Sequence, residues 1–349
     1  MTFYAIGLMS GTSLDGLDLC YASFTRNENG IWNFEILAGE TESYPRRMER
    51  KLADAMRMSA EELYELNASY GFYLGESVKH FISRHKIKKL DVIASHGHTV
   101  FHNPKKKYTV QIGDGRAIRL LNDVPVVYDF RSADVLRGGN GAPLVPVGDQ
   151  LLFSEYDACL NLGGFSNVSI EIKDRRIAFD ICPVNRVLNF FANKLKLPFD
   201  DGGNLARTGT VNQKVLAKLN ALSYYRRKPP KSLGAEWVNA EILPLMKRMK
   251  PADALATFTA HISVQIAAVL NAYGIRNLLV TGGGAYHTFL MEELRKKTEC
   301  SLVIPSAEII NYKEALIFAF MGILRLHNEI NVLSSSTGSS EDHCTGILV

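Results

Sequence analysis

The feature that most limits how this chain can fold is a polar, glycine-bearing turn between two apolar runs, found near the start of each half. In the first half the turn is Ser10-Gly-Thr-Ser-Leu-Asp-Gly16, and in the second it begins at Gly163. Short apolar runs bounded by such turns predict β-strands, so each half is expected to contain a strand, a turn and a second strand. This repetition predicts two similar domains whose turns face one ligand across a cleft.

The length of the chain and the order of its apolar segments support that division. A chain of 349 residues is long for a single hydrophobic core. Strands are predicted at 3–9, 17–24, 91–95, 108–112 and 124–128, and again at 157–162, 167–172, 176–180, 277–281 and 301–304. Helical patterns lie between them, including 45–84, 252–273 and 313–327. Strands mixed with helices predict an α/β architecture.

Charge and cysteine content argue against several classes of protein. The net charge of +4 is small for this length and gives no case for a nucleic-acid surface. The 5 cysteines lie far apart, which favours reduced thiols in the cytoplasm. The run 315–324 is too short to span a membrane, so no membrane role is expected. Three nearby histidines, at 96, 98 and 102, lack the carboxylate pattern that a zinc site needs.

The two turns have a composition that suits phosphate binding. A glycine-rich turn exposes backbone N–H groups, and the hydroxyls of Thr12 and Ser13 add donors for phosphate oxygens. Asp15 or Asp18 could hold Mg²⁺ directly or through water, because that ion prefers oxygen ligands and keeps several waters. A capped hairpin turn would also account for either turn alone.

A third glycine segment favours a nucleotide. Residues 278–281 have the pattern of a buried strand and are followed by Gly282, Gly283 and Gly284. Three glycines let a flat group lie against the backbone, whereas a tight strand-to-helix turn needs fewer. The sequence has neither the P-loop motif nor the Gly-x-Gly-x-x-Gly fingerprint. The sequence therefore predicts a nucleotide site of another kind.

Several further motifs occur in order along nearly the whole chain. They are Gly7-Leu-Met-Ser-Gly-Thr-Ser-Leu-Asp-Gly16, Ser95-His-Gly-His-Thr99, Gln111-Ile-Gly-Asp114, Asp129-Phe-Arg131, Gly141-Ala-Pro-Leu-Val-Pro146, Asn161-Leu-Gly-Gly164, Pro230-Lys-Ser232, Glu314-Ala-Leu-Ile-Phe-Ala319 and Thr337-Gly338. Together they resemble the motifs of the anhydro-N-acetylmuramic acid kinase family, within the sugar kinase, actin and heat-shock chaperone ATPase superfamily. The resemblance implies two similar actin-like (ribonuclease H-like) domains, with mixed sheets flanked by helices and an ATP cleft between them. Domain I would comprise 1–148 and about 325–349, and domain II 149–324.

The resemblance also implies an activity. The family uses ATP and Mg²⁺ to open 1,6-anhydro-N-acetylmuramic acid with water and to phosphorylate O6, giving N-acetylmuramic acid 6-phosphate in peptidoglycan recycling. Asp180 matches the family's catalytic aspartate, which deprotonates the water. Without the resemblance, Asp180 would be interpreted as a turn former or helix cap. A homodimer is implied as well.

Binding residues follow from the same resemblance. The implied ATP site consists of Gly11, Thr12, Ser13, Asp15, Gly16, Asp18, Gly163, Gly164, Gly282, Gly283 and Gly284, with Asp15 and Asp18 organising Mg²⁺. The implied sugar site consists of His98, Thr99, Arg131 and Glu314. A guanidinium can hold a carboxylate with two parallel hydrogen bonds, which suits Arg131 to the lactyl group of a muramic acid.

The chain departs from the family pattern near the predicted base. Ile181-Cys-Pro-Val-Asn185 stands where the family commonly reads Thr-Gly-Pro-Gly-Asn, and His98 stands where glutamine is more usual. Two alternatives therefore stay open at this point. One is a kinase of the same fold acting on another sugar, and the other is a non-catalytic nucleotide-binding regulator.

Overall fold

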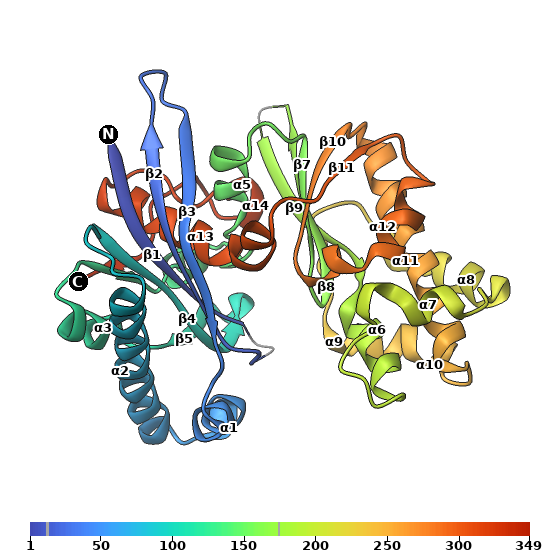
Figure 1. The fold of residues 1–349 in the computed structure, drawn as a ribbon, viewed down its shortest axis with the longest axis horizontal. Coiled ribbons are helices and arrows are strands. Elements are labelled where there is room, and N and C mark those ends of the chain that lie inside the picture. The colour runs from blue at the N-terminus through green and yellow to red at the C-terminus, as the bar shows by residue number, and fades with distance from the viewer. Residues whose placement is uncertain (12–13, 174) are drawn as a thin grey trace. The chain divides into compact units, whose positions relative to one another are not determined.

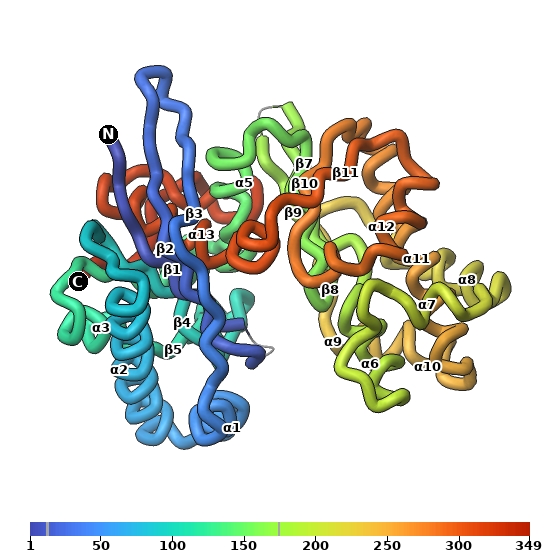
Figure 2. The backbone as a smooth tube through the Cα atoms, viewed as in Figure 1, coloured from blue at the N-terminus to red at the C-terminus, as the bar shows by residue number. Residues whose placement is uncertain are grey.

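The computed structural model describes residues 1–11, 14–173 and 175–349, and these form two compact units (Figure 1). Unit 1 comprises Met1–Phe153 and Tyr312–Val349, and unit 2 comprises Ser154–Asn311. The chain thus leaves unit 1, builds unit 2 and returns, as the tube in Figure 2 traces. The return at Tyr312 comes before the boundary of about 325 expected from the sequence, because most of helix α13 (Ala307–Leu326) belongs to unit 1.

Within the described residues, unit 1 contains a seven-stranded sheet in the order β12-β6-β4-β1-β2-β3, with β5 paired to β4. Its strands are β1 (Thr2–Ser10), β2 (Leu17–Arg26), β3 (Trp32–Glu42), β4 (Val92–Asn103), β5 (Tyr108–Ile112), β6 (Val126–Tyr128) and β12 (Ile347–Leu348). Strands β1, β2 and β3 form an antiparallel meander, whereas β4 runs parallel to β1 and β6 parallel to β4.

Helices cover both faces of this sheet. Successive side chains of a strand point to opposite faces, so neighbouring residues of β1 contact different helices. Ile6 and Leu8 of β1 pack in one core with Tyr70 and Phe81. Gly7, between them, lies so close to α13 that a Cβ there would collide with the backbone oxygen of Ala315. The helices of unit 1 are α1 (Arg46–Asp54), α2 (Ala60–Arg84), α3 (Gly115–Asn122), α4 (Ser132–Leu136), α5 (Pro146–Leu152), α13 and α14 (Ser334–Thr337).

Unit 2 contains a five-stranded sheet in the order β11-β10-β7-β8-β9, again counting the described residues. Its strands are β7 (Ala158–Leu162), β8 (Phe165–Ile172), β9 (Arg175–Pro183), β10 (Asn277–Thr281) and β11 (Ser301–Val303). The first three are antiparallel, while β10 runs parallel to β7 and β11 parallel to β10. This is the same order and direction as β6-β4-β1-β2-β3 of unit 1. The predicted pair of similar actin-like α/β units with mixed sheets is therefore confirmed.

Helices of unit 2 pack against its sheet in a second core. They are α6 (Asn185–Asn193), α7 (Asn204–Thr208), α8 (Gln213–Asn220), α9 (Ala235–Trp237), α10 (Leu243–Met246), α11 (Pro251–Tyr273) and α12 (Thr288–Arg295). Among the described residues, α11 alone is long and apolar enough to cross a membrane, and 78% of its most apolar window is buried inside the protein. Burial of that extent is expected of a core helix.

Candidate active site

The first predicted phosphate turn connects β1 to β2. Thr12 and Ser13 lie outside the described residues, but the ends of the turn are defined. The N–H of Leu14 donates to the carbonyl oxygen of Gly11 at 3.3 Å, and Leu14 has a φ of 61°. A Cβ at Gly16 would lie 2.8 Å from the carbonyl oxygen of Glu42, so glycine is needed for this close approach.

Asp15 lies within this turn and Asp18 just after it, and a cation would stabilise the two carboxylates. Asp18 is half-buried on β2, and its Oδ1 accepts a hydrogen bond from Oγ1 of Thr41 at 2.7 Å. Burial raises the pKa of Asp18, the Thr41 hydrogen bond opposes that rise, and the charge of the exposed Asp15 adds to it. Two carboxylates that repel each other fit Mg²⁺, which completes its shell with water and phosphate oxygens.

The predicted sugar residue His98 contacts Ser10, the first residue of this turn. Its Nδ1 lies 3.0 Å from Oγ of Ser10, which accepts a hydrogen bond from the hydroxyl of Tyr44 at 2.8 Å. The Tyr44 hydroxyl lies 2.9 Å from that of Tyr70. Burial lowers the pKa of His98 to about 4, so the ring is neutral at physiological pH. Sequence reasoning missed Tyr44 and Tyr70, because no motif marks an aromatic residue that reaches the turn from elsewhere in the chain.

Arg131 and Glu314, also predicted for the sugar, are electrostatic partners. Removal from water lowers the pKa of Arg131 to about 10, and the Glu314 carboxylate opposes that shift. Burial raises the pKa of Glu314, and Arg131 opposes it. The Nε of Arg131 donates to Nε2 of His96 at 2.9 Å, a partner that sequence reasoning considered only as a metal ligand. Thr99 accepts a hydrogen bond from Nε2 of Gln111 at 3.2 Å.

A buried ion pair lies next to Glu314 and was not predicted. Nζ of Lys313 is 2.6 Å from Oδ1 of Asp149, and the two side chains are 6% and 5% exposed. Both charges act on Glu314, with Lys313 lowering its pKa and Asp149 raising it. Nothing in the sequence around Lys313 distinguishes it from a surface lysine, because the partner on α5 becomes a neighbour only in the folded unit.

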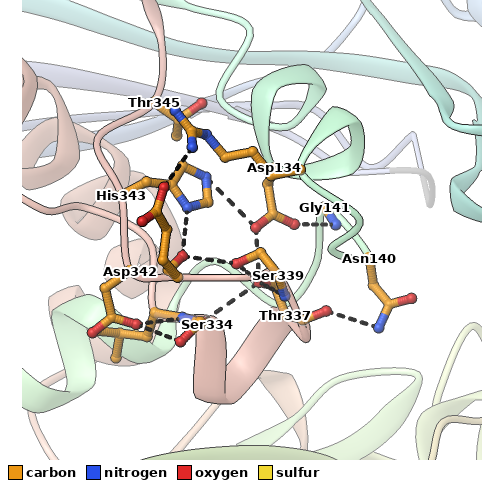
Figure 3. Close-up of polar contacts among 12 residues, drawn as sticks. Asp134, Asn140, Gly141, Ser334, Thr337, Ser339, Asp342, His343 and Thr345 are labelled. Atoms are coloured by element: carbon orange, nitrogen blue, oxygen red, sulfur yellow. Dashed lines mark hydrogen bonds and ion pairs between the residues drawn. The ribbon is translucent and has the colours of Figure 1, made fainter.

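Hydrogen bonds connect the segment after Arg131 to the C-terminal part of the chain (Figure 3). Asp134, which is 0% exposed, accepts hydrogen bonds from the N–H of Gly141 and from Oγ1 of Thr337, each at 2.7 Å. Nε2 of His343 lies 3.6 Å from Oδ1 of Asp134. Thr337 belongs to the Thr-Gly motif seen in the sequence, and its structural partner is thus Asp134.

The predicted base, Asp180, lies on β9 in unit 2. Its Oδ2 accepts a hydrogen bond from the N–H of Leu233 at 2.8 Å, and its backbone oxygen accepts one from the Tyr224 hydroxyl at 2.8 Å. Burial raises the pKa of Asp180, and the hydrogen bond from Leu233 opposes that rise. A half-buried carboxylate held by its backbone and by one oxygen is suited to accept a proton on the other oxygen.

Two predicted glycine segments come together at the ends of neighbouring parallel strands of unit 2. Gly163 and Gly164 follow β7, and Gly282 to Gly284 follow β10, which pairs with β7. A Cβ at Gly282 would collide with Oδ1 of Asn161, and one at Gly284 would lie 2.7 Å from Cβ of Leu162. By contrast, a Cβ at Gly164 would meet nothing within 4 Å. The glycines of the triplet thus permit contact between the strand ends, while Gly164 has an open face.

Comparison with known proteins supplies the family. The family model described as anhydro-N-acetylmuramic acid kinase matches residues 3–349. The chain belongs to the anhydro-N-acetylmuramic acid kinase family. Relatives of that name include those of Francisella tularensis subsp. novicida, 32% identical over 96% of each chain, and Rhodopseudomonas palustris, 35% identical over 92% of each. A third, from Mannheimia succiniciproducens, is 31% identical over 100% of this chain and 99% of its own.

The segment that departs from the common pattern of the anhydro-N-acetylmuramic acid kinase family keeps its backbone contacts. The N–H groups of Val184 and Asn185 donate to the carbonyl oxygens of Gly164 and Gly163 at 2.9 and 3.2 Å. Val184 has a φ of −130° and a ψ of −101°, outside the main allowed regions for a residue with a Cβ, so valine holds here a backbone conformation that glycine would reach more easily. Asn185 also donates through Nδ2 to the Leu162 oxygen at 3.2 Å. The altered residues therefore still connect the Asp180 strand to the second phosphate turn.

Each unit thus brings its own predicted residues together. Unit 1 gathers Asp18, Arg131 and Glu314, and places His98 beside the first turn. Unit 2 joins its two glycine segments. No group of three or more His, Cys, Asp or Glu side chains able to hold a metal is found among the residues described in either unit.

Proposed function

We propose that the protein is an ATP-dependent hydrolytic kinase of 1,6-anhydro-N-acetylmuramic acid. The observation that carries this proposal is the match of the kinase family model to residues 3–349, together with relatives that cover nearly the whole chain. The product would be N-acetylmuramic acid 6-phosphate, which places the enzyme in peptidoglycan recycling. A cytoplasmic homodimer without nucleic-acid or membrane partners is part of the same proposal.

The reaction combines two bond exchanges. A water oxygen bonds to the anomeric carbon C1 while the bond from C1 to O6 breaks, and O6 takes the γ-phosphoryl group as ATP becomes ADP. Asp180 accepts a proton from the water. Its raised pKa favours this role, because it makes the carboxylate a stronger base than an ordinary aspartate.

In the transition state, negative charge spreads over the oxygens of the transferred phosphoryl group. The protein stabilises that charge with hydrogen-bond donors and forms no covalent bond to the group. In this proposal Gly11, Thr12, Ser13 and Gly16 offer one phosphate turn, and Gly163 and Gly164 offer the other. Gly282, Gly283 and Gly284 receive the adenosine. The open space at Gly164 supports its assignment, because a ligand can approach the backbone there.

Asp15 and Asp18 would hold Mg²⁺, which supplies positive charge to the phosphate oxygens when bound. The charge of Asp15, which adds to the rise in the pKa of Asp18, supports this assignment. For the sugar, Arg131 would bind the lactyl carboxylate, with His98, Thr99 and Glu314 taking polar groups of the ring. Arg131 is partly exposed as a whole residue although its guanidinium is largely removed from water, and among the described residues only its Nε has a hydrogen-bond partner, which leaves both Nη atoms for a ligand.

The first test is ADP release from ATP and Mg²⁺ with and without 1,6-anhydro-N-acetylmuramic acid, together with mass spectrometry of the product. The expected product has gained one water and one phosphoryl group relative to the sugar. In H₂¹⁸O, the label should enter at C1 and not in the phosphate. Bound ATP without sugar-dependent ADP release would contradict the proposal and favour a non-catalytic regulator, whereas turnover of a different sugar would favour a related kinase.

A further inference from the structure

His96 holds one edge of the Arg131 guanidinium. Nε of Arg131 donates to Nε2 of His96 at 2.9 Å. Arginine has two edges that can hold a carboxylate with paired hydrogen bonds, one made by Nε with an Nη and one made by the two Nη atoms. Because Nε already donates to the His96 ring, the edge made by Nε and an Nη cannot hold a carboxylate.

The tautomer of His96 is fixed by its surroundings. Nδ1 lies 2.8 Å from the carbonyl oxygen of Gly97, so this nitrogen carries the proton and Nε2 has the lone pair that Arg131 requires. Burial and the charge of Arg131 both lower the pKa of His96. The ring therefore stays neutral and keeps accepting from Nε.

The fold holds the ring itself in place. His96 is 3% exposed, and its ring centroid lies 4.8 Å from that of Phe318. Gly97 has a φ of 72°, which favours glycine, and a Cβ there would lie 2.6 Å from the Ile112 oxygen. Phe318 stands one helical turn after Glu314 on α13, so the same helix face supplies a packing surface for His96 and a charge for Arg131.

The other edge of Arg131 is open. Among the residues that the structure describes, no hydrogen-bond partner is found for Nη1 or Nη2 of Arg131, and the residue is partly exposed. Glu314 acts on the guanidinium through its charge. The open edge thus has two parallel donors, in the geometry that one carboxylate fills.

We propose that His96 is a positioning and specificity residue, which holds Nε of Arg131 so that the two Nη atoms bind the lactyl carboxylate of the sugar end-on. This inference rests on the proposed function in one respect, the assignment of that carboxylate to Arg131. It adds the neighbour that orients the arginine and the edge that the ligand uses. Lysine cannot replace Arg131 in this role, because it has neither Nε nor a planar pair of donors.

The test is steady-state kinetics of the full chain with two sugars. 1,6-Anhydro-N-acetylmuramic acid carries the lactyl carboxylate, and 1,6-anhydro-N-acetylglucosamine lacks it. His96→Leu removes the acceptor, whereas His96→Gln keeps an acceptor oxygen at similar reach. His102→Leu is the matched control, because His102 lies on the same strand but bonds to Thr109 at 3.1 Å.

His96→Leu is expected to raise KM for the muramic sugar about tenfold or more, and to change kcat and the KM of the glucosamine sugar by less than about threefold. His96→Gln should recover most of the lost affinity, and His102→Leu should match the wild type. Equal losses with both sugars, or equal effects of the leucine and glutamine variants, would overturn the inference. If the wild type turns over neither sugar, the proposed function fails and the inference fails with it.

Nitrogen NMR of the wild type covers the case in which His96→Leu does not fold. Arg131→Lys assigns the arginine signals. Addition of the muramic sugar should shift the Nη signals of Arg131 and leave its Nε signal, as well as the Nδ1–H tautomer of His96, in place. A shift of the Nε signal with the Nη signals unchanged would overturn the inference.

Discussion

Asp134 should be among the most important polar side chains for the stability of unit 1. It is 0% exposed, and its two oxygens accept hydrogen bonds from Gly141 and Thr337, which join segments about 200 residues apart in the sequence. The change Asp134→Ala removes both acceptors at once. Gly141 is left with a buried backbone N–H that water cannot reach easily.

The expected loss follows from the two donors. An orphaned buried N–H costs about 1–3 kcal/mol, and this applies to Gly141 in full. The Thr337 hydroxyl also lies 3.5 Å from the carbonyl oxygen of Leu333, so it can redirect its proton and should lose about 1–2 kcal/mol. The sum predicts that Asp134→Ala lowers the free energy of unfolding of unit 1 by about 2–5 kcal/mol.

Urea denaturation followed by tryptophan fluorescence measures this loss. The chain has 2 tryptophans, Trp32 in unit 1 and Trp237 in unit 2, so a Trp237→Phe background makes fluorescence report unit 1. Asp342→Ala is the matched control. Asp342 also accepts two hydrogen bonds at 2.7 Å, both from Ser334, but it is exposed, so water replaces it at a cost of about 1 kcal/mol or less. Equal losses in the two variants would refute the reasoning.

Further predictions concern unit 2. Asp180→Asn should lower kcat by about 10²–10⁴-fold while ATP binding by calorimetry is kept, and retained turnover would remove Asp180 as the base. Because burial raises the pKa of Asp180, its contribution to stability is present below the unfolded pKa near 4 and lost as pH rises through the folded pKa. Asp180→Asn should therefore raise Tm at pH 7 but not in strong acid, and wild-type kcat should fall as acid protonates the base. Gly164→Ala should weaken ATP binding without lowering Tm, since its Cβ would meet nothing within 4 Å, whereas Gly282→Ala, at a φ of 78° and against Asn161, should lower Tm. Equal Tm losses in these two glycine variants would contradict that assignment.

The sequence predicted the class of fold and most of its elements, because periodicity is a local signal. The strand at 277–281 was placed to the residue, and 108–112 coincides with β5. Strand β3 was missed, since it mixes polar with apolar residues and, apart from the buried Trp32, its residues are exposed or only partly buried. The helical pattern at 45–84 is interrupted, because Ser59 caps a new helix with Glu62 as its capping-box partner.

The candidate site was predictable where a motif lies within one segment. The glycines after β7 and β10 were recognised because strand ends and glycine runs are visible locally. The pairing of His96 with Arg131 was not predicted, because it depends on how two strands and a left-handed glycine place a ring nitrogen. The ion pair of Lys313 was missed for a similar reason, because its partner Asp149 lies 164 positions away in the sequence.

The position of α13 determines the order in which the two units can be completed during synthesis. Residues 315–321 and 323–324 of this helix are each at most 2% exposed, and Gly7 and Gly148 pack directly against it. Unit 1 therefore lacks a large part of its core until the ribosome has made every residue of unit 2. Unit 2 is one continuous segment, Ser154–Asn311, so it can finish folding first. On the ribosome, the amino-terminal sheet must wait with one face uncovered, and chaperones that bind exposed apolar surface should engage this protein during that interval.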